Sequence, residues 1–287
     1  MNALREPVLS WYDDHARDLP WRRPEATPWA VMVSEFMLQQ TPVARVLPVY
    51  ATWLERWPVP AALADAPSGE AVRAWGRLGY PRRALRLHAA ATRITDRHDG
   101  QVPADYDELR ALPGVGDYTA AAIASFGFGR RHAVLDTNVR RVLARAVAGQ
   151  ALPGPSVSRA ERELAETLVP LERPERWAVA VMELGALVCT AADPRCEACP
   201  VAALCRWRAA GRPPYDGPPR RTQKWAGTDR QCRGALLAVL RDDDGPVTVA
   251  ALETAWPDGP QRTRALAGLL DDGLVVEQVG QGYSLPG

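Results

Sequence analysis

The amino-acid sequence predicts an all-α protein that ends in a small winged-helix-like domain. Apolar residues recur at helical spacing through most of the chain, and no convincing strand pattern occurs before residue 245. Residues 211–224 (GRPPYDGPPRRTQK) carry too much proline and glycine to pack, which is typical of a linker. The 287 residues are enough for about two domains. We therefore predict a first domain over 1–210, a linker over 211–227 and a second domain over 228–287.

The helices follow one another with little between them. An amphipathic helix opens the chain and is followed by a loop at 18–24, and helical spacing then runs from residue 29 to 57, with Pro42 and Pro48 marking ends or kinks. Glycine and proline separate the next predicted helices, at 70–78, 82–93, 106–112, 118–126, 139–148, 159–168 and 177–187. Beyond the linker, helices at 231–240, 249–256 and 260–271 precede strands at 274–278 and 283–285. Three helices followed by a hairpin are typical of a winged helix.

The composition indicates a globular protein. Hydrophobic residues at 47% and charged residues at 24% argue against long disorder and against a fibrous protein. The formal net charge is +1, so any attraction to phosphate must come from local clusters of basic residues. The start of the chain carries charges where a signal peptide needs an apolar core, and no apolar run is long enough to cross a membrane. These features predict a cytoplasmic protein without a membrane partner.

Four of the five cysteines form a cluster, Cys189-x6-Cys196-x2-Cys199-x5-Cys205. Disulfides are not expected in a chain without an export signal, whereas four thiolates suit either structural zinc or an iron–sulfur cluster. A zinc ribbon usually offers two C-x2-C pairs on separate hairpins, but here one pair is flanked by single cysteines in a helical context. We therefore predict a 4Fe-4S cluster, with zinc as the alternative, and we expect Cys232 to be a small core residue.

A glycine hairpin joins two of the predicted helices, in the sequence LPGVGDYTA. Gly114, Val115 and Gly116 form a tight turn in which glycine lets the backbone approach a phosphate closely. The amides that open the following helix would then donate hydrogen bonds to the anion, without reading the DNA sequence. A plain αα-hairpin between packed helices is the alternative interpretation.

Asp136 directly precedes a predicted helix, so we expect it to be the N-cap, where free amides and the helix dipole hold a carboxylate ionised. A cap alone would explain this residue. However, a local basic cluster suited to a polyanion surrounds it, formed by Arg130, Arg131, His132, Arg140, Arg141 and Arg145. A carboxylate within a phosphate-binding face suggests a role beside a cationic transition state.

Glu35 is a lone acid in the apolar run VSEFMLQQTP. If it faces inward, desolvation should raise its pKa toward neutrality, which suits a general acid. The alternative is an ordinary exposed helix glutamate. Gln39 and Gln40 carry donors and acceptors for base edges and could fill the gap left by an extruded nucleotide.

Together these motifs resemble the helix-hairpin-helix DNA glycosylases with a 4Fe-4S cluster, and within them the MutY family of mismatch adenine glycosylases. The resemblance covers about residues 10–208, and the segments that carry it are LPWR, VSEFMLQQTPV, WGRLGY, LPGVGDYTAAAI, VLDTNVRRVLAR and ELGALVC. It implies a two-lobed fold, with a six-helix barrel over about 22–134 and a cluster lobe formed by 1–21 and 135–210. It also implies a monomeric, nucleoid-associated enzyme that acts on double-stranded DNA with an A:8-oxoguanine or A:G mismatch.

The resemblance assigns a role to each matching residue. Glu35 would protonate adenine N7 and later activate the water, and Asp136 would steady the oxocarbenium-like sugar. The remaining implied site residues are Tyr118 and Asn138 in support of catalysis, Trp21, Arg22, Leu38 and Glu183 around the adenine, and Gln40 and Tyr80 as wedges in the duplex. The motifs described above predict the other DNA contacts, at Gln39, Gly114, Val115, Gly116, Arg140 and Arg141.

Tyr118 also bears on the reaction type, because relatives that cut the DNA backbone carry a lysine at that position. Lys224 is the only lysine in this chain, so a monofunctional hydrolase is expected.

The sequence departs from the family after the linker. MutY proteins carry a C-terminal Nudix-like domain of over a hundred residues that recognises 8-oxoguanine, whereas about sixty residues follow the linker here. Recognition of the opposite base is therefore left open. Two other functions are compatible with parts of the pattern: a thymine glycosylase acting on T:G mismatches, and a non-enzymatic DNA-binding redox sensor. Glu35 favours adenine over thymine, because thymine has no N7 to protonate.

Overall fold

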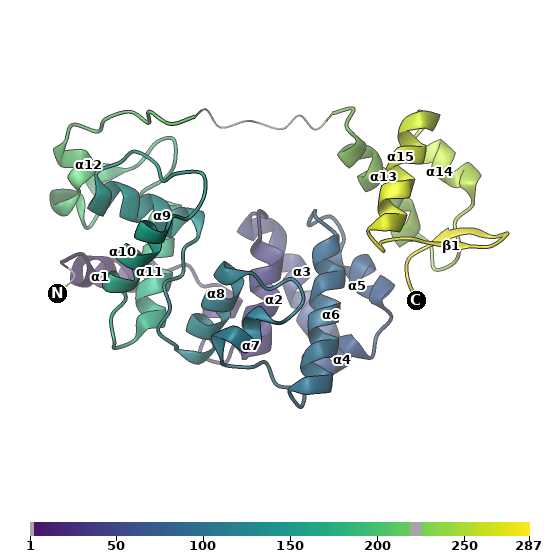
Figure 1. Cartoon of the computed structure of the whole chain (residues 1–287), viewed down its shortest axis with the longest axis horizontal. Helices are drawn as coiled ribbons and strands as arrows, with labels where there is room; N and C mark the ends of the chain where they lie inside the picture. The colour runs from purple at the N-terminus through teal and green to yellow at the C-terminus, as the bar shows by residue number, and fades with distance from the viewer. Residues whose placement is uncertain (1–2, 219–225) are drawn as a thin grey trace. The chain divides into compact units, whose positions relative to one another are not determined.

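The computed structural model describes residues 3–218 and 226–287, so the centre of the predicted linker lies outside the described residues. The described chain is helical with one small hairpin, which confirms the predicted all-α fold (Figure 1). No helix among these residues has the length and apolar character needed to span a bilayer.

The chain divides into two compact units. The first comprises Met1–Met32, Ala104–Ala111 and Val115–Pro219, and the second comprises Val33–Pro103, Leu112–Gly114 and Arg220–Gly287. The domain and lobe boundaries predicted from the sequence divide the chain at other positions, and they remain a prediction.

The first unit is built from helices on both sides of the glycine hairpin. It contains α1 (Arg5–His15), η1 (Pro20–Arg22), the start of α2 (Pro28–Leu38), α7 (Tyr106–Arg110), α8 (Asp117–Phe128), α9 (Thr137–Leu143), η2 (Ala144–Ala148), α10 (Arg159–Leu168), α11 (Pro174–Leu187), η3 (Cys196–Ala198), η4 (Ala202–Leu204) and α12 (Arg206–Ala209).

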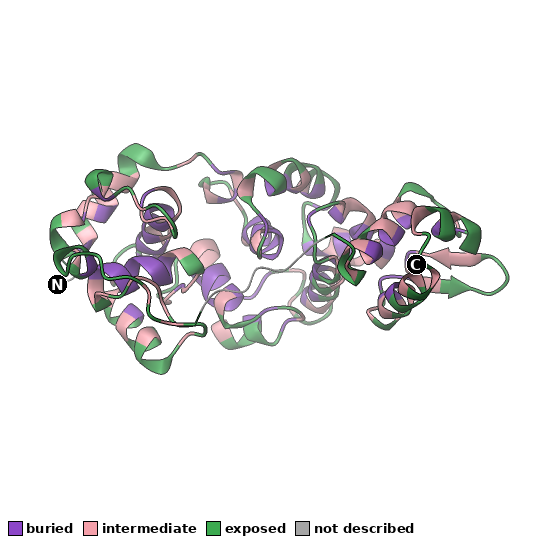
Figure 2. Ribbon diagram, turned by 90° about the horizontal axis from the view of Figure 1, so that it is seen from above, coloured by how far each residue is buried: buried purple, intermediate pink, exposed green. Residues whose placement is uncertain are grey.

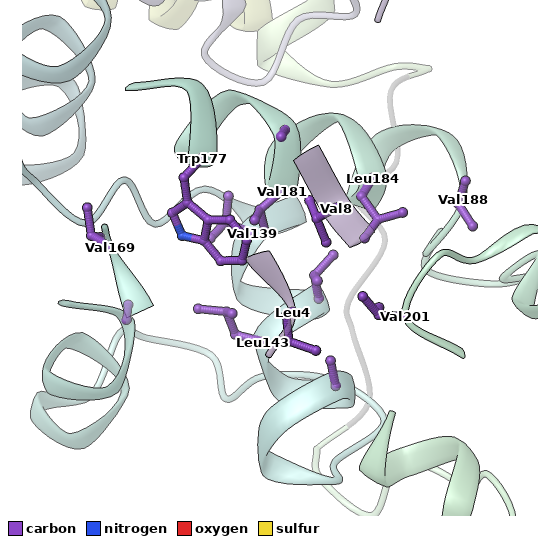
Figure 3. Close-up of a cluster of buried hydrophobic side chains, with 14 residues drawn as sticks. Leu4, Val8, Val139, Leu143, Val169, Trp177, Val181, Leu184, Val188 and Val201 are labelled. Atoms are coloured by element: carbon purple, nitrogen blue, oxygen red, sulfur yellow. The ribbon is translucent and has the colours of Figure 1, made fainter. Parts of the chain in front are cut away.

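The main core of this unit gathers apolar side chains that are spaced three or four residues apart on their helices. Val139 and Leu143 of α9 pack with Val181 and Leu184 of α11, and Val8 of α1 joins the same cluster (Figure 3). This core fixes the start of α9, where the candidate carboxylate lies, and the end of α11, from which the cysteine loop departs.

The second unit contains the end of α2, then α3 (Val43–Arg56), α4 (Pro60–Ala64), α5 (Ser68–Trp75), α6 (Arg82–Arg97) and the C-terminal domain. Helix α6 packs against both α4 and α5. Trp53 meets the rings of Trp57 and Trp75 edge-on, with centroids 4.6 and 5.6 Å away. Figure 2 shows the resulting pattern, with buried residues on the inner sides of the helices and exposed residues outside.

The C-terminal domain has its own core and consists of α13 (Asp229–Asp242), α14 (Val249–Ala255), α15 (Gly259–Asp271), β1 (Val276–Gln278) and β2 (Gly282–Ser284). Val276 pairs with Ser284 in the antiparallel hairpin, and Val247 adds an isolated bridge to Tyr283. Cys232 is fully buried in α13, as predicted. Three helices and a hairpin with an extra bridge match the winged-helix pattern expected from the sequence.

The C-terminal domain also contacts helix α5 directly. The amide of Gly69 donates to Pro286 O at 2.8 Å, and Arg241 Nε donates to Val72 O at 3.0 Å. A Cβ at Gly69 would lie 2.3 Å from Pro286 O, so this approach requires glycine. The sequence pattern predicted a tethered domain and did not reveal this docking, because the contacts use backbone atoms far apart in the chain.

One predicted helix differs in form. Residues 139–148 were expected to be one α-helix, but α9 ends at Leu143 and continues as a π-helix over Ala144–Ala148. Arg145 in this turn donates to Ala151 O, Thr190 O and Ala191 O at 2.6–3.0 Å. Such wider turns are held by tertiary contacts, which apolar periodicity does not reveal.

Candidate functional site

Glu35 is buried, with 5% of its surface exposed, in the second unit. It lies on α2, which is buried over the whole stretch from Trp29 to Met37. An interior carboxyl group is costly unless it is neutral or well partnered, and such groups cluster at functional sites. The structure therefore excludes the alternative of a solvated helix glutamate.

Asp136 is the N-cap of α9, as predicted. One carboxylate oxygen accepts from Val139 N at 2.6 Å, and the other accepts from Asn138 Nδ2 at 2.7 Å. Burial raises the pKa of Asp136, and the bonds from Val139 and Asn138 together with the charge of Arg141 oppose this rise without cancelling it. The cap is therefore present as predicted, but burial outweighs its effect on the pKa, because the sequence revealed the cap and not the loss of water around it.

Asn138 and Arg141 connect this carboxylate to the cysteine loop. Asn138 Oδ1 accepts from Arg141 Nη2 at 2.8 Å, and the same guanidinium donates to Gly185 O and to Cys189 O at 2.7 and 2.6 Å. Gly185 is required here, since a Cβ on it would lie 2.7 Å from both Cβ and O of Asn138. Gly185 was not among the predicted site residues, and its only signal in the sequence is a glycine inside the helix pattern ELGALVC.

Arg140 and Arg141 were expected to contact DNA, but both are buried. Arg140 forms a two-point ion pair with Glu161 at 2.6 and 2.9 Å and also donates to Gly154 O and Ser156 O. These inward bonds argue against the predicted phosphate contacts, which would require both side chains to leave their partners. The local charge pattern did not reveal the direction of the side chains.

Glu183 is fully buried and binds two arginines within the first unit. Its oxygens accept from Arg17 at 2.6 and 2.8 Å and from Arg22 at 2.8 Å. Burial raises the pKa of Glu183, but the bonds from Arg17 and Arg22 lower it by more, so the net shift is downward. This ion-pair network fixes the η1 segment that carries Trp21 and Arg22, while Leu38 lies in the second unit. Arg17 was not among the predicted site residues, although it lies close to the LPWR motif.

The glycine hairpin has the expected backbone. Gly114 adopts a φ of +79°, and a Cβ there would lie 2.7 Å from Cβ of Arg86. Gly116 caps α8, and a Cβ at this position would meet no atom within 4 Å. Gly114 is therefore needed for the turn, whereas the space around Gly116 leaves the start of α8 accessible to an anion. Tyr118 lies half-buried in the first turn of this helix.

Gln40 and Tyr80 share an unusual backbone conformation. Their φ angles are +54° and +47°, which residues other than glycine rarely adopt. Tyr80 is also among the large side chains that remain exposed, at 44%. Strained backbone often clusters at functional sites, so both residues keep their candidacy as wedges.

The four clustered cysteines line one small cavity beside Arg145 and Trp207. Arg145 Nη1 lies 3.4 Å from Cys189 Sγ, and Cys205 Sγ donates to Arg145 O at 3.5 Å. The pKa of Cys199 is raised to about 11, chiefly by burial and to a smaller extent by the other three thiols. In the described part of the chain, no three Cys, His, Asp or Glu side chains converge as for a single metal ion. The four thiols line one common space, and four thiolates are the donor set that zinc or an iron–sulfur cluster takes.

Comparison with known proteins identifies the family. Residues 33–169 match the model of the HhH-GPD superfamily base excision DNA repair proteins. The adenine DNA glycosylase of Mycobacterium tuberculosis (strain ATCC 25618 / H37Rv) is 54% identical over 282 residues, which cover 98% of this chain and 92% of the relative. The chain belongs to the adenine DNA glycosylase family. This confirms the MutY-type resemblance.

Other adenine DNA glycosylases match different lengths of this chain. The Mycolicibacterium smegmatis protein is 52% identical over 98% of this chain and 95% of its own length. The human adenine DNA glycosylase is 45% identical over 72% of this chain and 40% of its own length. The C-terminal domain is therefore shared with the mycobacterial relatives.

Solved structures agree with the family fold. A thermostable thymine-DNA glycosylase aligns with a TM-score of 0.66 and 27% identity, over 72% of this chain and 95% of the other. A trapped endonuclease III–DNA covalent intermediate aligns with a TM-score of 0.58 and 26% identity, over 71% and 93%.

Proposed function

We propose that this protein is a monofunctional base-excision-repair enzyme that hydrolyses the N-glycosidic bond of adenine mispaired with 8-oxoguanine or guanine. The observation that carries the proposal is 54% identity, over nearly the whole chain, to a protein named adenine DNA glycosylase. The burial of Glu35 and the capped position of Asp136 support it, because the reaction needs two carboxylates in different environments.

The proposed chemistry assigns one task to each carboxylate. Glu35 donates its proton to N7 of the extruded adenine, so the bond between C1′ and N9 breaks with its electrons on the base. The sugar becomes oxocarbenium-like, and the Asp136 carboxylate stabilises this positive charge. A water then attacks C1′ and gives a proton to Glu35, which restores the acid. Adenine leaves as a neutral molecule and an abasic site remains.

An activity assay tests this function directly. Duplexes with A:8-oxoguanine, A:G and T:G are incubated with the protein, and abasic sites are cleaved with hot alkali. We expect adenine release from the first two duplexes, strand breaks only after alkali, and little covalent adduct on borohydride treatment, because Tyr118 cannot form an imine. Release of thymine from T:G would favour the alternative glycosylase, absence of any release would favour the non-enzymatic sensor, and strong trapping would overturn the hydrolytic route.

We further propose a 4Fe-4S cluster held by Cys189, Cys196, Cys199 and Cys205. When bound, such a cluster would cross-link the loop between α11 and α12. Anaerobically purified protein is expected to be yellow-brown, to absorb broadly near ~400 nm and to hold about four irons per chain. Cys199→Ser should lose the iron, whereas Cys232→Ala should keep it, since Cys232 lies in α13 of the other unit. Colourless protein with one zinc per chain would contradict the assignment.

The C-terminal domain bears on how well the enzyme distinguishes 8-oxoguanine from guanine. If this domain contacts only the DNA backbone, the enzyme should process both A:8-oxoguanine and A:G. Its preference for 8-oxoguanine should then be narrower than in a family member with a Nudix-like domain, because one lost base contact costs about 1–3 kcal/mol, or roughly ten- to a hundredfold in discrimination. Single-turnover rates on both duplexes are measured for the whole chain and for a chain ending at Gly211, with thermal unfolding as a control for folding. Strong selectivity of the whole chain that disappears on truncation would show that this domain reads the opposite base.

The proposed partners follow from this activity. The enzyme acts on double-stranded DNA as a monomer, in the cytoplasm at the nucleoid. Gly114, Val115 and Gly116 grip the DNA backbone, and Gln39, Gln40 and Tyr80 enter the duplex where the adenine leaves it.

A further inference from the structure

The two loops that carry the proposed wedge residues meet at one buried arginine. Arg83 lies in the first turn of α6 and is 5% exposed. Its Nη1 donates to the carbonyl oxygens of Phe36, Met37 and Gln39, at 2.8, 3.1 and 2.6 Å. These carbonyls belong to the last turn of α2 and the residue that follows it, where helical carbonyls lack partners within the helix.

The second nitrogen of the same guanidinium reaches the other loop. Nη2 donates to Gly79 O at 3.0 Å and to Thr41 Oγ1 at 3.0 Å. The Thr41 hydroxyl in turn donates to Leu78 O at 3.1 Å. One planar group therefore ties the residues on both sides of Gln40 to the residue that precedes Tyr80.

The charge of Arg83 suits this position, although no carboxylate takes part in the described contacts of its side chain. A cation at the C-terminus of α2 is favoured by the helix dipole. The guanidinium carbon also lies 5.3 Å from the ring centre of Trp75 and 5.4 Å from that of Tyr80, within the range of a cation–π contact. Nε is buried without a hydrogen-bond partner, and burial lowers the pKa of Arg83 to about 10. The Arg83 guanidinium is therefore buried away from water, and its described hydrogen bonds go mainly to backbone carbonyl groups of the two loops.

Each of the two loops that Arg83 binds contains one residue with a strained backbone. Gln40 and Tyr80 each adopt a positive φ, and such residues persist only where the surrounding structure determines their conformation. The bonds of Arg83 reach the neighbours of both residues. Without the two donor nitrogens of the Arg83 guanidinium, each loop would relax independently toward ordinary backbone angles.

We propose that Arg83 is a positioning residue for base extrusion, which fixes the Gln40 and Tyr80 loops relative to each other so that both side chains enter the duplex together. This inference rests on the proposed wedge role of Gln40 and Tyr80. Arg83 does not touch the DNA in this proposal and takes no part in the chemistry of the glycosidic bond.

The test compares two substrates that differ only in the cost of extrusion. In the first duplex adenine faces 8-oxoguanine, and in the second it faces a tetrahydrofuran abasic analogue and has no base-pairing partner. Extrusion costs least for a base that is already unpaired. Single-turnover rates and duplex affinity are measured for the full chain and for Arg83→Lys, which keeps the positive charge but has one nitrogen instead of a fork.

We expect Arg83→Lys to bind both duplexes within about threefold of the unmodified protein and to lose about ten- to a hundredfold in rate on A:8-oxoguanine, a size typical of small misplacements. On the unpaired adenine its rate should return to within about threefold, because the chemistry is intact. Thr41→Val, which removes only the hydroxyl link, should give the same pattern more weakly and guards against a folding defect in the first variant. Arg97→Lys, on the exposed side of α6, is the matched control and should change neither rate.

Equal losses on the two duplexes, or no loss on either in both variants, would overturn the role of Arg83. Failure of the unmodified protein to release adenine from either duplex would instead overturn the proposed function.

Discussion

Glu35→Gln is expected to abolish adenine release while leaving affinity for the mismatched duplex nearly unchanged. The amide keeps the shape of the side chain but cannot transfer a proton to the departing base. General acid catalysis contributes about 10²- to 10⁴-fold to a rate, so the single-turnover rate should fall at least this far. Rates are measured after alkaline cleavage, and affinity is measured by gel shift under the same salt conditions.

Two comparison variants show whether the loss is specific. Glu55→Gln changes an exposed helix glutamate and should leave the rate unchanged. Asp136→Asn should also lose most activity, about 10²- to 10³-fold, by removing the charge that steadies the cationic sugar. Asparagine caps a helix as well as aspartate does, so the start of α9 should persist. Near-normal rates for Glu35→Gln would refute the assignment of the acid.

Glu183→Gln is expected to cause a large loss of stability. The change leaves the guanidinium groups of Arg17 and Arg22 beside a neutral amide, in a position where the native carboxylate is fully buried. Breaking a buried ion pair costs about 3–5 kcal/mol, and we expect about 2–4 kcal/mol here because Arg17 is 36% exposed at its side chain. At about 2–4 °C per kcal/mol, the melting temperature should fall by roughly 5–15 °C.

The difference in stability between the unmodified protein and Glu183→Gln should depend on pH. The arginines hold the folded-state pKa of Glu183 below its ordinary value despite burial, so the stabilisation is present above the unfolded pKa and is lost as the pH falls through the folded one. The gap between the unmodified protein and Glu183→Gln should therefore narrow in acid. Glu163→Gln, which breaks an exposed pair with Arg159, is the control and should change little. Equal melting temperatures at neutral pH would show that the buried network does not stabilise the fold.

Local features of this protein were determined by the sequence itself. The helices follow from apolar spacing, the turn at Gly114 follows from the need for a positive φ, and the cap at Asp136 follows from the preference for a short acceptor before a helix. The four cysteines come together because they lie within one short loop. Each of these signals involves residues only a few positions apart, which is the range over which backbone preference acts.

The direction of the charged side chains was decided only by the tertiary structure. Arg140 and Arg141 form part of a basic cluster in the sequence, yet they bond inward to Glu161 and Gly185. Arg83 appears in the sequence as one more helix arginine, and its role depends on carbonyl groups that lie more than forty positions earlier. The upward pKa of Asp136 and the docking of Gly69 against Pro286 also depend on segments distant in the chain. Burial, desolvation and long-range hydrogen bonds arise only when those segments pack, so a single sequence reports the charge of a residue but not what that charge meets.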